Sequence, residues 1–174
     1  MKKIPLSRGY EAIVDDEDYE DLMQCKWHVR SDHRTHYAVR SQRISRGRFL
    51  PETMHRYILG LERGDKTQVD HINHNGLDNR RKNLRACSHN QNVQNSRVRR
   101  DSRCGFKGVN ERRPGRWRAL IRVNGRRITI GNFRCPREAA IAYDGAALKY
   151  FGDFALLNFP KSSRLNFRRM ICQT

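Results

Sequence analysis

"RWRALIRVNGRRITIGNF", residues 116–133, contains two runs in which apolar and polar residues alternate. Asn124 and Gly125 separate the runs, and Asn-Gly is a strong signal for a two-residue turn between antiparallel strands. A turn at this dipeptide fixes the pairing of the two runs. The predicted partners are Val123 with Arg126, Arg122 with Arg127, Ile121 with Ile128, Leu120 with Thr129 and Ala119 with Ile130.

This register assigns the side chains to two faces, because side chains alternate along a strand. The apolar face, a predicted core, carries Trp117, Ala119, Ile121, Ile128 and Ile130. The opposite face carries Arg116, Arg118, Arg122, Arg127 and Thr129. Residues 135–153 carry a proline at position 136, continue with an alanine-rich stripe and reach Gly152, which is typical of an amphipathic helix. We therefore predict a three-stranded antiparallel sheet packed on one helix.

The net charge of +18, from 36 basic and 18 acidic residues among 174, indicates a polyanionic partner. The excess is uneven, because residues 1–95 hold 17 basic and 13 acidic residues, whereas residues 96–174 hold 19 and 5. A merely solvated sheet face would mix both signs. Arginine without acid favours DNA recognition, since arginine pairs with guanine edges in the major groove.

Residues 105–160 resemble the plant ethylene-response-factor (apetala-type) DNA-binding domain, in the motifs "GV", "IR", "EAAIAYDGAAL" and "LNFP". The resemblance implies that the sheet reads the major groove of double-stranded DNA. It implies contacts by Lys107, Asn110, Arg112, Arg116, Arg122, Arg127 and Tyr143, to which the geometry of the face adds Arg118. Asn110, Pro114 and Thr129 stand where the plant proteins commonly carry arginine, tryptophan and tryptophan, so we expect a different target sequence.

Residues 96–105, "SRVRRDSRCG", are too polar to form a core and predict a linker. The segment is either a solvated spacer or an arm that lies along DNA and inserts arginine into a minor groove. The basic chain favours the arm slightly, with Arg97, Arg99 and Arg100 as its contacts. Residues 161–174 form a basic tail of unassigned role.

A second stretch, "VDHINHNGLDNRRKNLRACSHNQNVQN", residues 69–95, indicates two short strands, a long polar loop between them, and a helix capped by Ser88. This order would bring Asp70, His71 and helix side chains into one cluster. Histidine can act as a base near neutral pH, and carboxylate and amide oxygens suit magnesium. The residues alone leave catalysis open, because asparagines often only make turns.

The spacing of "VDHIN", "NLR" and "QN", with "MHRYIL" upstream, resembles the HNH nucleases of phage-type homing endonucleases over residues 54–95. The resemblance implies a ββα-metal fold with His71 as general base and Asn83 orienting it. It implies one divalent metal, Mg²⁺ or Mn²⁺, held by Asp70 and Asn92, with His89 as the alternative ligand. His55 and Arg56 would contact the scissile strand, with a structural role as the equal alternative for His55.

Five scattered cysteines without a CxxC pair predict free thiols and no structural zinc. The sequence contains neither an apolar run long enough for a membrane span nor a secretory leader, so we expect no membrane partner. A cytoplasmic, nucleoid-associated protein of a bacterium or phage-infected cell is expected. Seven acids in residues 11–21 favour a helix beginning near Asp15 over a metal site.

Together these features predict an α+β protein with a nuclease domain at 1–95, an arm at 96–105, a DNA-binding domain at 106–160 and a tail at 161–174. We expect a site-specific, metal-dependent DNA endonuclease of the homing type that leaves 5′-phosphate and 3′-hydroxyl ends. With one active site per chain, it would nick as a monomer or a weak dimer. The alternatives are a non-catalytic DNA-binding regulator and a sequence-tolerant nuclease of phage defence or packaging.

Overall fold

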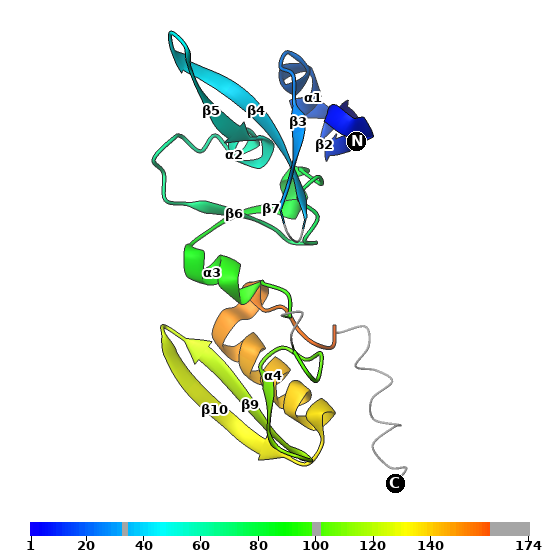
Figure 1. The fold of residues 1–174 in the computed structure, drawn as a ribbon, viewed down its shortest axis with the longest axis vertical. Coiled ribbons are helices and arrows are strands. Elements are labelled where there is room, and N and C mark those ends of the chain that lie inside the picture. The colour runs from blue at the N-terminus through cyan, green and yellow to red at the C-terminus, as the bar shows by residue number, and fades with distance from the viewer. Residues whose placement is uncertain (33–34, 99–101, 161–174) are drawn as a thin grey trace. The chain divides into compact units, whose positions relative to one another are not determined.

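The computed structural model describes residues 1–32, 35–98 and 102–160, and the chain divides into two compact units, Met1–Asn92 and Val93–Thr174 (Figure 1). Each unit combines helices with antiparallel strands, which confirms the predicted α+β class. Among the described residues, no helix has the length and apolar character that crossing a membrane requires.

The first unit contains three small antiparallel sheets and short helices. Its elements are β1 (Lys2–Pro5), β2 (Glu11–Val14), α1 (Asp16–Met23), β3 (His28–Ser31), β4 (His36–Ser45), β5 (Arg48–Thr53), α2 (Met54–Ile58), β6 (Gln68–His71) and β7 (Leu84–Cys87), followed by α3 (His89–Gln94). β1 pairs with β2, β4 lies between β3 and β5, and β6 pairs with β7. The strand pair and helix predicted for residues 69–95 are therefore present.

One hydrophobic core joins the N-terminal strands to the nuclease-like segment. Its buried residues are Ile4, Leu6, Ala12, Val14, Leu22, Trp27, Val29, Ala38, Met54, Ile58 and Leu84. Met54 belongs to α2 and Leu84 to β7, so the N-terminal residues supply the apolar support that a small β6–β7–α3 motif lacks.

The loop between β6 and β7 is attached to β2 and α1. The Ile13 amide donates to the Leu77 carbonyl at 2.8 Å, and the Asn79 amide donates to the Ile13 carbonyl at 2.8 Å. The Arg81 guanidinium donates to Asp18 at 2.6 Å, and the Arg81 amide donates to Asp15 at 2.7 Å. α1 begins as predicted, and its acids also fix the position of this loop.

The second unit is a three-stranded antiparallel sheet in the order β10-β9-β8, with one helix on one face (Figure 1). Its elements are β8 (Val109–Arg113), β9 (Arg116–Val123), β10 (Arg126–Phe133) and α4 (Pro136–Phe151). Three of the buried core residues come from the sheet and four from the helix: Val109, Ala119 and Ile121, with Ala139, Ala140, Tyr143 and Ala147. The predicted sheet and covering helix are confirmed.

The predicted register holds from the turn to Leu120–Thr129, and Asn124 and Gly125 both have positive φ, at 49° and 79°. Beyond that pair the prediction is wrong, because Ala119 pairs with Gly131 and a bulge displaces Ile130. The bulge lets Ile130 and Phe133 both pack against the core. Ile128, predicted in the core, is 37% exposed.

A buried carboxylate fastens the end of the unit to α4. Asp144, which is 1% exposed, accepts hydrogen bonds from the backbone amides of Asn158 at 2.8 Å and Phe159 at 2.9 Å. The Asn158 side chain in turn accepts from the Lys107 amide at 2.6 Å. Gly108, the residue after Lys107, must be glycine, because a Cβ at this position would overlap the Tyr143 ring. These contacts explain why "GV", "AYD" and "LNFP" occur together.

Candidate functional site

His71 ends strand β6 and its imidazole is buried. Its Nε2 lies 3.4 Å from Asn79 Oδ1, and its ring lies edge-on to His55, with centroids 5.1 Å apart. An amide oxygen beside Nε2 favours the tautomer with the proton on Nε2 and the lone pair on Nδ1. Burial lowers the pKa of His71, which favours the neutral form that a general base requires.

His55 and Tyr37 form the remaining walls around His71. The His55 Nε2 lies 3.0 Å from the Thr53 hydroxyl, and the Tyr37 ring centroid lies 5.6 Å from that of His55 and 5.8 Å from that of His71. Burial is the largest of the effects that lower the pKa of His55 to about 3. Near neutral pH, His55 is therefore an uncharged neighbour of His71.

Gly76 lets the loop after β6 approach strand β4. A Cβ at this position would lie 2.7 Å from the Tyr37 ring and would also collide with the His36 carbonyl. The close approach holds the loop, and with it Asn79, against the wall that carries Tyr37.

The Asp70 carboxylate is buried and paired with Arg85, its partner across the β6–β7 ladder. Arg85 donates to Asp70 Oδ2 from Nε at 2.9 Å and from Nη2 at 2.7 Å. A two-pronged ion pair fixes the orientation of the carboxylate.

Helix α3 approaches the same strand through Gln68. Asn92 Nδ2 donates to Gln68 Oε1 at 2.8 Å, and His89 Nδ1 lies 3.2 Å from Gln68 Nε2. Gln68 and Asp70 lie two residues apart on β6 and so share a face. Both candidate ligands of α3 thus contact Gln68, and their approach to Asp70 itself stays a prediction. Gln68 was not predicted, since its role depends on where α3 packs.

The helix begins as the sequence predicts. The Gln91 amide donates to the Ser88 hydroxyl at 3.3 Å, while the Ser88 amide donates to the Gln91 side chain at 2.8 Å. This reciprocal pair is a capping box, which orients the first turn of α3.

The asparagines of the loop brace one another. Asn83 accepts from the Asn73 amide at 3.0 Å and donates to the Asp78 carbonyl at 2.7 Å. Asn73 also donates to the Asp78 carboxylate at 2.8 Å. Asn83 therefore braces the loop, and its role in orienting His71 stays a prediction. A direct side-chain contact to His71 comes from Asn79, which sequence reasoning missed.

The donor set near Asp70 suits a hydrated divalent ion. Among the residues that the structure describes, no three histidine, cysteine, aspartate or glutamate side chains gather as an enclosing metal site. One carboxylate and one amide oxygen, from Asp70 and Asn92, are hard ligands, and magnesium commonly keeps waters and substrate phosphate as its other ligands. The residues present fit Mg²⁺ or Mn²⁺, and the Asp70 carboxylate would then bind both the metal ion and the Arg85 guanidinium.

Arg56 has an internal role. Its guanidinium donates to the carbonyls of Thr67 at 2.7 Å, Glu62 at 2.8 Å and Asp65 at 3.2 Å. These three bonds close the loop before β6, which argues against the predicted contact with the scissile strand.

The face of the sheet opposite α4, the open face, carries Asn110, Arg118, Arg122 and Arg127, whereas Arg112 lies at the bulge of β8. Asn110, Arg112, Arg116, Arg122 and Arg127 are all exposed. Arg118 is half-buried between Asn110 and Asn132, its register partners on the two neighbouring strands. Within the described part of the chain, its Nε has no hydrogen-bond partner. The bulge brings Asn132 to this face, a position that the predicted register assigned to the core side.

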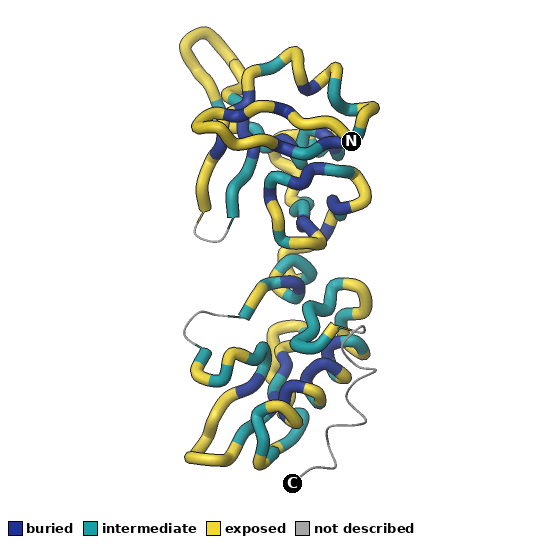
Figure 2. The backbone as a smooth tube through the Cα atoms, turned by 90° about the vertical axis from the view of Figure 1, so that its right-hand side faces the viewer, coloured by how far each residue is buried: buried dark blue, intermediate teal, exposed yellow. Residues whose placement is uncertain are grey.

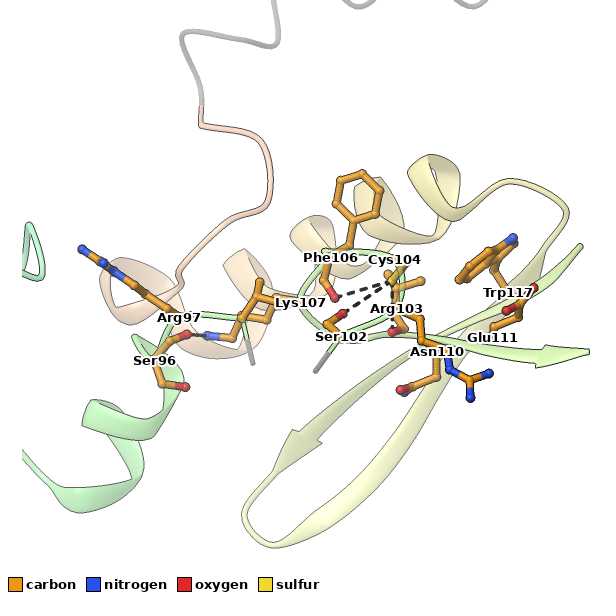
Figure 3. A pocket seen from close by; sticks show the side chains of 13 residues that line it. Ser96, Arg97, Ser102, Arg103, Cys104, Phe106, Lys107, Asn110, Glu111 and Trp117 are labelled. Atoms are coloured by element: carbon orange, nitrogen blue, oxygen red, sulfur yellow. Dashed lines mark hydrogen bonds between the residues drawn. The ribbon is translucent and has the colours of Figure 1, made fainter. Parts of the chain in front are cut away.

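Two of the predicted DNA contacts are turned inward. Lys107 lines a cavity of about 520 Å³ together with Arg97 and Trp117, and its ammonium donates to the Ser96 carbonyl at 2.7 Å (Figure 3). Burial lowers the pKa of Lys107 to about 8. Tyr143 is only 4% exposed, which contradicts its predicted contact with DNA.

The predicted arm is only partly described. Arg97 is exposed, whereas Arg99, Arg100 and the tail 161–174 lie outside the described residues. The arm therefore stays a prediction.

Comparison with known proteins finds two different similarities. Residues 52–94 match the family model for HNH endonucleases. The chain is 48% identical over 64 residues to Dehydration-responsive element-binding protein 2A of Arabidopsis thaliana, which covers 36% of this chain and 19% of that protein. It is 49% identical over 63 residues to protein 2D of that plant, covering 35% and 31%.

A rice relative, Dehydration-responsive element-binding protein 2A of Oryza sativa subsp. japonica, is 43% identical over 65 residues, covering 36% of this chain and 24% of that protein. The chain spans less than a third of each of these three relatives. Both predicted resemblances are confirmed: residues 52–94 are similar to HNH endonucleases, and the chain also contains a domain similar to dehydration-responsive element-binding proteins.

Proposed function

We propose that this protein is a site-specific, metal-dependent DNA endonuclease of the homing or mobile-element type. The observation that carries the proposal is the buried His71, set beside Asp70 on β6 and facing Asn79, within a segment similar to HNH endonucleases. A neutral, oriented imidazole next to a carboxylate has the chemistry that phosphodiester hydrolysis requires.

His71 acts as the general base. Its Nε2 proton is directed at Asn79 Oδ1, so Nδ1 accepts the proton of the attacking water. Asp70 and Asn92 would hold one divalent ion, and that ion would supply stabilisation of the charge on the phosphate and on the departing 3′ oxygen. The products are 5′-phosphate and 3′-hydroxyl ends.

The arginine face of the second unit selects where the cut falls. The relatives' names say that those proteins bind a dehydration-responsive element. The arginines of this chain suit the base edges of double-stranded DNA. Asn110 and Thr129 differ from the family pattern, so the target of this chain is its own.

A non-catalytic DNA-binding regulator is the second candidate. It is favoured by the Arg85–Asp70 ion pair, which engages the proposed metal ligand directly. A sequence-tolerant nuclease is the third, and it would cut unrelated DNA equally well.

Supercoiled plasmid and a genomic library incubated with the protein, with Mg²⁺ or with chelator, test these candidates after sequencing of the ends. We expect Mg²⁺-dependent nicks at a few related sites. His71→Ala should abolish cutting and retain DNA binding, while the exposed His28→Ala should cut normally. Cutting by His71→Ala would refute the base assignment, and binding without cutting by the unmodified chain, in Mg²⁺ and in Mn²⁺, would favour the regulator.

A further inference from the structure

The outer part of the β4–β5 hairpin, residues 41–49, extends from the first unit (Figure 1). All nine of these residues are exposed, as the yellow tube of Figure 2 shows. The turn at Arg46 and Gly47 uses a left-handed glycine, with Gly47 φ at 73°. We call this segment the outer hairpin.

The outer hairpin carries apolar side chains that its own unit does not cover. Phe49 is 57% exposed and Ile44 is 40% exposed. A two-stranded ribbon without a packed face is only marginally stable in water. Because Phe49 and Ile44 are exposed, they do not stabilise the free protein by burial. Their place on a ribbon that stands clear of the core indicates a surface for a partner.

The charge of the outer hairpin identifies the class of partner. Arg43, Arg46 and Arg48 lie on it, and residues 41–51 contain no acid. Arg43 and Phe49 are register partners, so a cation and an aromatic ring stand side by side on the ribbon. A two-stranded ribbon fits the major groove, where arginine binds phosphates and base edges and apolar groups contact thymine methyls.

The base of the hairpin leads directly to the candidate active site. β5 ends at Thr53, whose hydroxyl lies 3.0 Å from His55, and His55 lies against His71. At about 3.4 Å per residue, the five steps from Arg48 to Thr53 span about 17 Å. That length corresponds to about 5 bp of duplex, at about 3.4 Å per base pair.

We propose that the outer hairpin is a DNA-binding element of the first unit, which grips the duplex about 5 bp from the scissile phosphate. The proposal rests on the proposed function in taking DNA as the substrate. It assigns to the first unit a DNA contact of its own, separate from the arginine sheet of the second unit, and so makes the cutting position depend on both units.

The test compares two charge-matched double variants in the full chain with His71→Ala, which binds without cutting. Arg46→Ala with Arg48→Ala removes two cations from the hairpin, and Arg8→Ala with Lys66→Ala removes two exposed cations elsewhere on the unit. Binding to a labelled duplex with the mapped nick site is measured against salt concentration and by hydroxyl-radical footprinting. Should no nick site exist, a duplex of mixed sequence takes its place.

The hairpin variant should lose protection beside the nick site and reduce the slope of log Kd against log salt by about 2, at about 0.9 per phosphate contact. The control variant should keep the protection beside the nick site and the salt dependence of the His71→Ala parent. Equal slopes and footprints in the two variants would overturn the proposal, as would a Phe49→Ala change that dissociates an oligomer while DNA binding stays intact. Footprinting does not depend on cleavage, so a chain that binds but never cuts would refute the nuclease and leave the hairpin assignment standing.

Discussion

Single residues determine the surroundings of His71, the proposed general base. Burial keeps the imidazole neutral, His55 and Tyr37 confine its ring, and Asn79 fixes the tautomer. The sequence was sufficient to nominate Asp70 and His71, because the spacing of "VDHIN", "NLR" and "QN" resembles the HNH pattern. It was insufficient for Asn79, which follows His71 by eight positions, because only the path of the loop brings the two side chains together.

Asn79→Ala should slow nicking about tenfold, the effect expected from about 1.4 kcal/mol of lost orientation, without weakening DNA binding. The Asn79 contact raises the pKa of His71, so its loss should move the acid limb of the pH–rate profile to lower pH. Single-turnover nicking across pH is the measurement. Asn75→Ala removes a loop hydrogen bond to Leu77 only and serves as the control. A rate loss without any shift of the acid limb would mean that Asn79 only supports the loop.

His55 makes the first unit sensitive to acid. Burial lowers the pKa of His55 from 6.5, its value in the unfolded chain, to about 3 in the fold. Between pH 6.5 and pH 3 the unfolded chain therefore binds a proton that the folded protein does not. The contribution of neutral His55 to the free energy of unfolding is therefore complete above pH 6.5 and is lost as the pH falls toward 3. From pH 7 to pH 5 the loss from this residue should be about 2 kcal/mol.

Urea unfolding in a Trp117→Phe background, where Trp27 alone reports on the first unit, measures this loss. His55→Phe should reduce the difference between pH 7 and pH 5, whereas the exposed His28→Phe should leave it unchanged. An unaltered acid loss in His55→Phe would show that His55 is not held neutral in the fold.

Among the elements, the β9–β10 hairpin was the most predictable, because an Asn-Gly turn fixes its register by counting. The bulge at Ile130 was not predictable by counting. It arises from the need to bury both Ile130 and Phe133 against α4, and that need becomes visible only once the helix is in place. The same limit applies to Lys107 and Tyr143, because the family resemblance did not predict that Lys107 is half-buried and Tyr143 buried.

Arg122→Ala and Arg127→Ala should each reduce the preference for the target site by about 1 to 3 kcal/mol while folding is retained. The two arginines are register partners on the open face, so they act on neighbouring positions. Arg126→Ala is the control, because Arg126 is exposed but pairs with Val123 and points to the other face. Competition binding with target and scrambled duplexes measures the effect. If all three variants discriminated equally, the open face would make only nonspecific contacts.

At the scale of the whole molecule, the two units carry different charge and different chemistry. The first is nearly balanced and holds the set Asp70, His71 and Asn92, while most of the net charge lies after residue 95. The composition of the sequence was enough to separate these roles, because charge and motif change together along the chain. The cationic β4–β5 hairpin was not predicted, because the acidic residues of α1 offset its arginines when the net charge is summed over residues 1–95.

Because the chain has one proposed catalytic site, built from Asp70, His71 and Asn92, it should cut one DNA strand per binding event. Supercoiled plasmid should therefore pass first to the open circle, and linear product should form later from a second, independent nick. A gel time course with plasmid in excess over protein measures the order of products. The rate of nicking should rise linearly with protein concentration, because one protomer suffices. Linear product that appears without an open-circle intermediate, at a rate that rises with the square of protein concentration, would instead require two protomers acting together on opposite strands.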